Sequence, residues 1–184
     1  MIFTRKTITT TAEEQIDLSR LRIVPAKDKI AFSGFISGVR EIDSWAKEKA
    51  VKFHSLGRSR VFIAVELGGA TAYGFYVLST SNFENSLLDE QSESDYYRGK
   101  GAPFIYINYL AVRQHRQNCG VGRMLFIHAL RQCYDASQIL PFCGVALRPL
   151  DSRLAQMYSK YGFVAKPDQD SSHPLMVLPM QTLE

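Results

Sequence analysis

Two glycines in a short polar stretch give this chain its clearest chemical signal. The stretch reads Gln117-Asn118-Cys119-Gly120-Val121-Gly122, and it joins an apolar run that ends at Val112 to a helix-like run that begins near Gly122. Backbone N–H groups at the start of a helix have no partner inside it, and the helix dipole favours an anion there. Glycine also lets a ligand approach the backbone closely. The spacing therefore predicts a phosphate-binding loop, with an ordinary turn as the alternative.

The charged residues around this loop are all basic. No Asp or Glu occurs between Asp95 and Asp135, and the same stretch contains six Lys or Arg residues and two histidines. The whole chain has a formal net charge of +4. A basic region around a phosphate-type loop indicates an anionic ligand, and nucleic acid is a second candidate partner. The alternative is a chance cluster of charges on a solvated face.

Length and composition set the broad class of the protein. The chain has 184 residues, of which 46% are hydrophobic and 22% charged, so one globular domain with a buried core is expected. No apolar stretch reaches transmembrane length, and the N-terminus lacks the apolar segment of a signal peptide. Three cysteines, Cys119, Cys133 and Cys143, match no metal-site spacing and favour free thiols in a reducing cytoplasm.

The elements that position the loop follow from the hydrophobic pattern. Apolar residues recur at helical spacing between Glu41 and Ser55 and again between Gly122 and Tyr134. Asp151 or Ser152 can cap a further short helix that runs to Lys160. Strands are expected at 60–65, 71–79, 104–112, 139–147, near 164 and at 175–178, with a long loop over 80–103. The pattern predicts a single α/β domain over 1–184, with residues 1–30 as a variable N-terminal arm.

Two signatures, in this order, resemble the Gcn5-related N-acetyltransferase (GNAT) superfamily. The first is a strand ending in Val followed by [Gln/Arg]-x-x-Gly-x-[Gly/Ala], which matches Val112 and the loop 117–122. The second is a helix that carries a tyrosine before a Gly-Phe turn, as in Tyr158-Ser159-Lys160-Tyr161-Gly162-Phe163. The resemblance implies the GNAT fold, a central mixed, twisted sheet of six to seven strands flanked by about four helices. In that fold the two central parallel strands splay apart.

The resemblance also implies an acetyl-CoA-dependent N-acetyltransferase that uses no metal. It assigns the diphosphate to the loop, the peptide-like pantetheine arm to the open edge of the preceding strand, and the role of general acid to Tyr158. Tyr161 takes that role only if the register is shifted, and a core tyrosine bonded elsewhere is the alternative for Tyr158. The implied coenzyme-binding residues are Leu110, Ala111, Val112, Gln117, Asn118, Cys119, Gly120, Val121, Gly122 and Arg123.

Segments 38–45, 57–62 and 173–180 are similar to the acetyltransferase toxins of bacterial toxin–antitoxin pairs, which acetylate the α-amino group of aminoacyl-tRNA and block translation. The similarity implies aminoacyl-tRNA as substrate and a ribbon-helix-helix antitoxin as partner. It also implies a homodimer, as is common among similar proteins, in the cytoplasm and without membrane association. Cys119, Arg113 and Asn108 depart from the residues usual at these positions.

The acceptor amine is constrained by the composition of the central strand. The run 104–112 contains no carboxylate that could act as a base. A lysine amine with a pKa of about 10.4 loses its proton at a cost of about 4 kcal/mol near neutral pH, whereas an α-amine with a pKa of about 8 needs less help. The sequence therefore favours an α-amine, with Glu66 or a water molecule as alternative bases. Residues expected to contact RNA phosphates are Arg58, Arg60, Arg98, Lys100, Arg113 and Arg116.

Two other functions stay open at this point. One is an acetyltransferase for a small-molecule amine or a protein N-terminus. The other is a non-catalytic module that binds coenzyme A or a partner protein. A screen of amine acceptors without RNA separates the first from a tRNA-acetylating toxin, and tight coenzyme binding without turnover supports the second.

Overall fold

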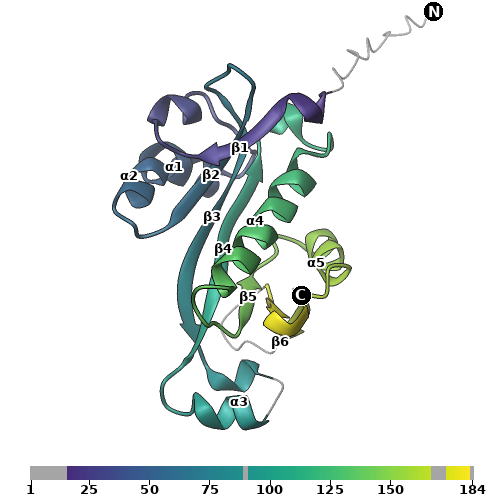
Figure 1. Cartoon of the computed structure of the whole chain (residues 1–184). Coiled ribbons are helices and arrows are strands. Elements are labelled where there is room, and N and C mark those ends of the chain that lie inside the picture. The colour runs from purple at the N-terminus through teal and green to yellow at the C-terminus, as the bar shows by residue number, and fades with distance from the viewer. Residues whose placement is uncertain (1–15, 89–90, 167–172, 183–184) are drawn as a thin grey trace, which may run out of the picture.

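The computed structural model describes residues 16–88, 91–166 and 173–182, which form one seven-stranded sheet with helices packed on it (Figure 1). The strand order is β1-β2-β3-β4-β5-β7-β6. The central pair β4–β5 is parallel, and the other five pairs are antiparallel. The strands are β1 (Leu21–Pro25), β2 (Arg60–Glu66), β3 (Ala72–Phe83), β4 (Ala102–Val112), β5 (Gly144–Leu147), β6 (Val164–Lys166) and β7 (Leu175–Pro179). The predicted fold class is confirmed.

Helices cover both faces of the sheet because neighbouring residues of a strand point to opposite sides. Phe75 of β3 stacks on Trp45 of α1, and α2 contributes Ala50 to the same buried cluster. Tyr76, the next residue, belongs to a second cluster with residues of α4 and α5. The α-helices are α1 (Arg40–Glu48), α2 (Ala50–Ser55), α3 (Gln91–Tyr96), α4 (Val121–Ser137) and α5 (Ser152–Ser159). Among the described residues, no helix is long and apolar enough to cross a membrane.

The central strand β4 contains a bulge at the point where it leaves β5. Its pairing with β3 shifts by one residue around Asn108, so Ile107 before the bulge and Leu110 after it both face the cluster under α4 and α5. A bulge bends its strand and increases the local twist. The parallel pairing ends at the same place, with Ile107 opposite Leu147. Over residues 108–112, β4 therefore has a described strand on the β3 side alone.

The predicted long loop over 80–103 is wrong. β3 continues to Phe83, α3 lies within this region, and β4 already begins at Ala102. Leu87, which follows β3, packs with Ala102 and Phe104 of β4 in a small buried cluster. The cluster joins residues that are distant in the chain, so no periodic pattern in the polar sequence of 80–103 indicates it.

Two other elements differ from the expectation. The single helix expected from Glu41 to Ser55 is divided at Lys49, whose φ of −116° interrupts the helical backbone between α1 and α2. The strand expected over 139–147 is confined to β5, because the apolar Ile139 is 81% exposed and lies outside the sheet. A strand predicted from apolar residue types alone was therefore too long.

The expected variable arm over 1–30 enters the sheet at Leu21, where β1 pairs with Glu66 at the end of β2. A short 3-10 helix, η1 (Leu18–Arg20), precedes this edge strand. Residues 1–15 of the expected arm lie outside the described residues.

Candidate functional site

The loop predicted to bind phosphate caps the longest described helix, α4. Gly120 is the N-cap of this helix and adopts a left-handed backbone with a φ of 85°. Asn118 is also left-handed, with a φ of 60°. Within the described residues, no acceptor is found for the backbone N–H groups of 118–123. Six donors at the positive end of a helix suit a diphosphate, so the donor set fits coenzyme A.

Gln117, the first residue of the loop signature, holds the loop in place through hydrogen bonds to neighbouring segments. Its Nε2 donates hydrogen bonds to the carbonyl oxygens of Ser37 at 2.7 Å and Val112 at 3.0 Å. Its backbone N–H donates to the carbonyl of Gln114. The side chain therefore joins the loop to the end of β4 and to the segment before α1. We assign Gln117 a positioning role, which the sequence alone could not separate from direct coenzyme contact.

The two loop glycines meet different surroundings. A Cβ atom at Gly120 would lie 2.9 Å from Cδ1 of Leu18, and the left-handed backbone already disfavours a side chain there. A Cβ atom at Gly122 would meet Cγ2 of Val112 at an ordinary 3.5 Å. The fold therefore requires glycine at 120 but not at 122.

The backbone edge of β4 over 108–112 lies directly before this loop and is open on the β5 side, because β5 ends at Leu147. A strand edge binds extended peptide-like chains through its main-chain N–H and C=O groups. The pantetheine arm is such a chain. The expected coenzyme residues 110–112 lie on this strand edge, and 118–123 lie at the head of α4 that follows it in the chain.

Tyr158 lies in the last turn of α5, within the buried cluster under α4. Its side chain is 7% exposed and packs against Phe126 and Phe163, with ring centres 5.0 and 5.9 Å away. Ile107 and Leu147, the last residues of the parallel pairing, belong to the same cluster. Tyr158 therefore shares one buried cluster with the residues at which β4 and β5 separate.

The hydroxyl of Tyr158 is a protonated donor. Burial raises its pKa to about 12, and the negative charge of Asp151 adds to the effect. Within the described residues, no hydrogen-bond partner is found for this hydroxyl. The alternative of a core tyrosine bonded elsewhere therefore finds no support in these contacts.

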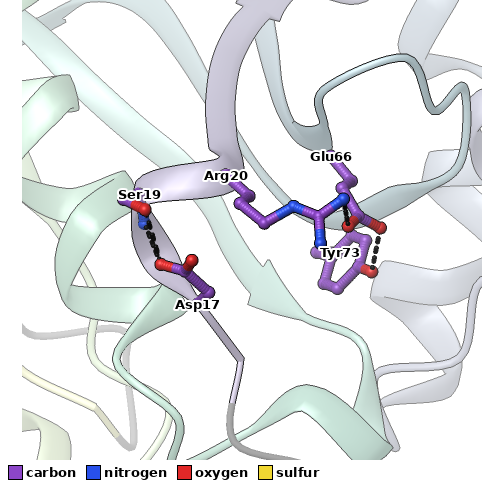
Figure 2. A network of polar contacts seen from close by, with 5 residues as sticks. All are labelled: Asp17, Ser19, Arg20, Glu66 and Tyr73. Carbon is purple, nitrogen blue, oxygen red and sulfur yellow. Dashed lines mark hydrogen bonds and ion pairs between the residues drawn. The ribbon is translucent and has the colours of Figure 1, made fainter.

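Glu66, the alternative base, is bound in a network at the far end of β2. Its Oε1 lies 3.3 Å from Nη2 of Arg20, and its Oε2 accepts a hydrogen bond of 3.1 Å from the Tyr73 hydroxyl (Figure 2). β3 separates β2 from β4. Asn108 on β4 accepts a hydrogen bond from Ser79 and is no base. We therefore assign Glu66 to the fold rather than to proton transfer.

The basic residues expected to contact RNA lie in three places. Two are at or just before the start of β2, two precede β4, and two follow the end of β4. They are Arg58 and Arg60, Arg98 and Lys100, and Arg113 and Arg116, respectively. β4 spans 11 residues, or about 35 Å, between the second and third pairs. The fold therefore does not gather all six into one patch.

Arg113 is used mainly inside the protein. Its Nε, Nη1 and Nη2 donate to the carbonyl oxygens of Ala72 at 3.1 Å, Gly34 at 2.6 Å and Ser33 at 3.3 Å. Burial lowers the pKa of its guanidinium. Arg116 lies over the ring of Tyr73, 5.1 Å from its centre. Thr71, Tyr73, Arg113, His115 and Arg116 line a small open pocket of about 170 Å³.

Metal ligands and thiols offer little chemistry near the loop. Within the described ranges, no group of three or more His, Cys, Asp or Glu side chains is arranged to hold a metal ion. The three cysteines are free. Cys119 donates a hydrogen bond from Sγ to the carbonyl of Gln117, and burial raises the pKa of Cys133 to about 12. The chemical groups of this region are therefore the loop N–H groups and the Tyr158 hydroxyl.

No protein-family model matches the chain. It is 28% identical over 163 residues to a probable toxin TacT of Sinorhizobium fredii, in an alignment that covers 82% of this chain and 86% of the relative. It is 25% identical over 157 residues to a tRNA-acetylating toxin of Mycobacterium tuberculosis, with 85% of this chain and 90% of the relative covered. These relatives confirm the predicted resemblance to the acetyltransferase toxins.

Solved structures of toxins share the fold. A tyrosine-to-phenylalanine mutant of KacT superimposes with a TM-score of 0.76 at 23% identity, covering 89% of this chain and 97% of that chain. AtaT complexed with acetyl-methionyl-tRNAfMet superimposes with a TM-score of 0.76 at 20% identity, covering 89% of this chain and 96% of that chain. A mutant AtaT bound to acetyl-CoA and the C-terminus of the antitoxin AtaR superimposes with a TM-score of 0.69 at 19% identity, covering 89% of this chain and 95% of that chain. At these identities the likeness establishes the fold.

Proposed function

We propose that this protein is an acetyl-CoA-dependent N-acetyltransferase that acetylates the α-amino group of aminoacyl-tRNA and blocks translation as a toxin. The observation that carries the proposal is the run of N–H groups at 118–123, for which the described part of the chain offers no acceptor and which adjoin the open edge of β4. The curated relative named as a tRNA-acetylating toxin and the AtaT structure with acetyl-methionyl-tRNAfMet support the choice of acceptor.

The chain binds acetyl-CoA through its backbone in this proposal. The N–H groups of 118–123 bind the diphosphate, and Arg123 adds a positive charge in the first turn of α4. The edge of β4 at 110–112 pairs with the pantetheine arm. When bound, the thioester supplies an activated acetyl group, and the strand edge leads it toward the separation of β4 from β5.

Tyr158 donates the proton that the departing sulfur needs. In the reaction a C–N bond forms, the C–S bond breaks, and one proton passes from the amine to the thiol. The Tyr158 hydroxyl gives its proton to the sulfur and is reprotonated by the proton that the amine releases. Its raised pKa keeps it protonated before transfer, so it acts as an acid rather than a base.

The lack of a positioned base among the described residues of β4 and at Glu66 favours an acceptor amine with a low pKa. β4 carries no carboxylate, and Glu66 is bound to Arg20 and Tyr73. An α-amine has a larger neutral fraction at pH 7 than a lysine side chain, whose pKa is about two units higher. Aminoacyl-tRNA presents such an amine next to phosphates, and exposed arginines such as Arg58 and Arg60 suit those phosphates.

The partners in this proposal are a ribbon-helix-helix antitoxin and a second copy of the chain, in the cytoplasm. The AtaT structure with the C-terminus of the antitoxin AtaR supports an antitoxin as partner. A short neighbouring reading frame with a ribbon-helix-helix pattern is the expected source of the antitoxin. Co-expression of the two reading frames should relieve growth arrest caused by this chain alone.

The decisive experiment mixes the purified protein with acetyl-CoA labelled in the acetyl group and a pool of aminoacylated tRNAs. The label should appear on the amino acid attached to the RNA and should be released with it by mild alkali. Deacylated tRNA is the control and should remain unlabelled. Absence of label on every aminoacyl-tRNA overturns the tRNA acceptor, and label on free amines or peptides instead identifies a small-amine or N-terminal acetyltransferase.

A further inference from the structure

Residues Asp17–Arg20, here called the N-terminal hook, form a self-capped turn directly before β1. Oδ1 of Asp17 accepts hydrogen bonds from the backbone N–H of Ser19 at 3.0 Å and from its hydroxyl at 2.6 Å. These bonds lower the pKa of Asp17. The N–H of Arg20 donates to the carbonyl of Asp17 and closes the turn. The hook is therefore a defined structure rather than an extended lead into the strand.

Two contacts fasten the hook to the hairpin of β2 and β3, and the residue before the hook adds a third anchor. Arg20 forms an ion pair with Glu66, whose other carboxylate oxygen accepts the Tyr73 hydroxyl bond (Figure 2). The backbone carbonyl of Arg20 accepts a hydrogen bond of 2.9 Å from the N–H of Leu67. Ile16, just before the hook, packs against the cluster under α4 and α5. The hook thus has fixed anchors on the sheet.

Within the hook, the side chain of Leu18 contacts the predicted phosphate-binding loop, residues 117–122. A Cβ atom at Gly120 would lie 2.9 Å from Cδ1 of Leu18 and within 4 Å of two further Leu18 atoms. Leu18 therefore fills the space beside the left-handed Gly120, the residue that starts α4. Gln117 braces the first half of the loop from the Ser37 side, and Leu18 covers the second half from the opposite end of the chain.

The loop conformation needs such support. The left-handed backbone of Asn118 is sparsely populated for a residue with a side chain and persists where the surroundings fix it. Gly120 adopts left- and right-handed backbone about equally readily, so a free loop would leave the observed conformation at this residue too. The described contacts within residues 118–120 are few, since the Sγ bond of Cys119 is local and the N–H groups have no acceptor. A loop that leaves this conformation no longer presents its N–H groups together, and its apparent affinity falls with the competent fraction.

We propose that the N-terminal hook is a positioning element for coenzyme binding, in which Leu18 holds Gly120 and the loop in the conformation that receives the diphosphate. The inference rests on the proposed function. It extends the coenzyme site to a residue about 100 positions upstream of the loop signature, outside every motif that the sequence analysis singled out. Leu18 acts through the loop, so it should affect coenzyme affinity and leave the rate of transfer at saturation unchanged.

The test is titration calorimetry of the full chain with coenzyme A. Leu18→Ala should weaken binding by about three- to tenfold, which corresponds to a competent loop fraction of about 10–30%. Leu18→Met, which refills the space, should bind within about twofold of the unsubstituted protein. Leu67→Ala is the matched control, because Leu67 is 57% exposed in the same region and its backbone bond to Arg20 is kept. Its coenzyme affinity should not change.

Two further measurements separate positioning from general destabilisation. The KM for acetyl-CoA should rise in Leu18→Ala while kcat stays unchanged, and thermal unfolding should report a folded protein. If Leu18→Ala does not fold, Arg20→Gln removes the ion pair without creating a cavity and should weaken binding by about two- to fivefold. Equal affinity of the unsubstituted protein and these variants overturns the inference. Failure of the unsubstituted protein to bind coenzyme A instead overturns the proposed function.

Discussion

The Tyr76 hydroxyl lies 2.7 Å from Nδ1 of His128, and this contact joins the middle of β3 to the middle of α4. Burial raises the pKa of Tyr76 far above its usual value, so its hydroxyl is protonated and can donate to Nδ1 of a neutral His128. His54 is bound in the same way, because its Nδ1 accepts the backbone N–H of Val61 at 3.0 Å. Two histidines therefore stabilise this fold in their neutral form.

This arrangement predicts a loss of stability in mild acid. Burial, with nearby Arg131, lowers the pKa of His128, and burial with Arg60 lowers that of His54. The unfolded chain therefore binds more protons as pH falls below about 6.5, so stability is complete above that pH and declines below it. The expected loss is on the order of 1 kcal/mol, since solvent screens these half-buried rings.

Urea unfolding at pH 7.5 and pH 5 measures this effect. His128→Gln removes one titrating ring, so the difference in unfolding free energy between the two pH values should be smaller than in the unsubstituted protein. His115→Gln replaces an exposed histidine and is the matched control, expected to keep the full difference. An unchanged pH dependence in His128→Gln contradicts the assignment of a neutral His128.

Tyr158→Phe should slow acetyl transfer by at least about a hundredfold and leave coenzyme affinity within about twofold. The substitution removes the hydroxyl and keeps the ring that packs against Phe126 and Phe163, so stability should change little. Tyr161→Phe is the control, because Tyr161 also packs against Phe126 and is the alternative acid in a shifted register. Single-turnover rates with labelled acetyl-CoA give the comparison. If Tyr158→Phe transferred acetyl groups at the unsubstituted rate and Tyr161→Phe were slow, Tyr161 rather than Tyr158 would be the general acid.

The elements built from local patterns were the ones that the sequence could predict. α4 and β4 lie close to their predicted bounds, because helical spacing and a long apolar run identify each without reference to other segments. Asp151 and Ser152 were the two predicted candidates for the N-cap of α5, and the structure has Asp151 there, with its side chain accepting the N–H of Leu154. Local sequence carries this information in full.

Contacts between distant segments could not be predicted from the sequence. The brace from Gln117 to Ser37 spans 80 residues, and the contact of Leu18 with Gly120 spans more. The break between α1 and α2 at Lys49 has no glycine or proline to mark it. The left-handed Asn118 is the exception, because its residue type is a signal: asparagine tolerates this conformation.

The loop glycines should respond in opposite ways to alanine. Gly122→Ala adds a Cβ at an ordinary contact distance within the first turn of α4, so it should raise the free energy of unfolding by about 0.5–1 kcal/mol. Gly120→Ala places a Cβ against Leu18 on a left-handed backbone, so it should lower that energy by about 1–2 kcal/mol and weaken coenzyme binding. Denaturant unfolding and calorimetry measure the two effects. Equal destabilisation by both substitutions contradicts the loop geometry.

RNA binding should depend most on the arginines at the start of β2. Arg60 pairs across the sheet with Leu78, which pairs in turn with Ile107 at the separation of β4 from β5, so this pair of arginines lies level with the proposed transfer site. The double substitution of Arg58 and Arg60 by Gln should lower the salt slope of tRNA binding by about 2, one for each lost phosphate contact.

Arg98→Gln is the matched single control for this experiment, because Arg98 is already neutralised in part by its ion pair with Asp95. In Arg98→Gln the salt slope of tRNA binding should fall by less than half of the decrease expected in the double variant. Filter binding of tRNA over 50–200 mM salt gives these slopes, and coenzyme A affinity should be the same in all variants. If the slope is unchanged in the double variant and reduced in Arg98→Gln, the RNA approaches the connection before β4 and not the start of β2.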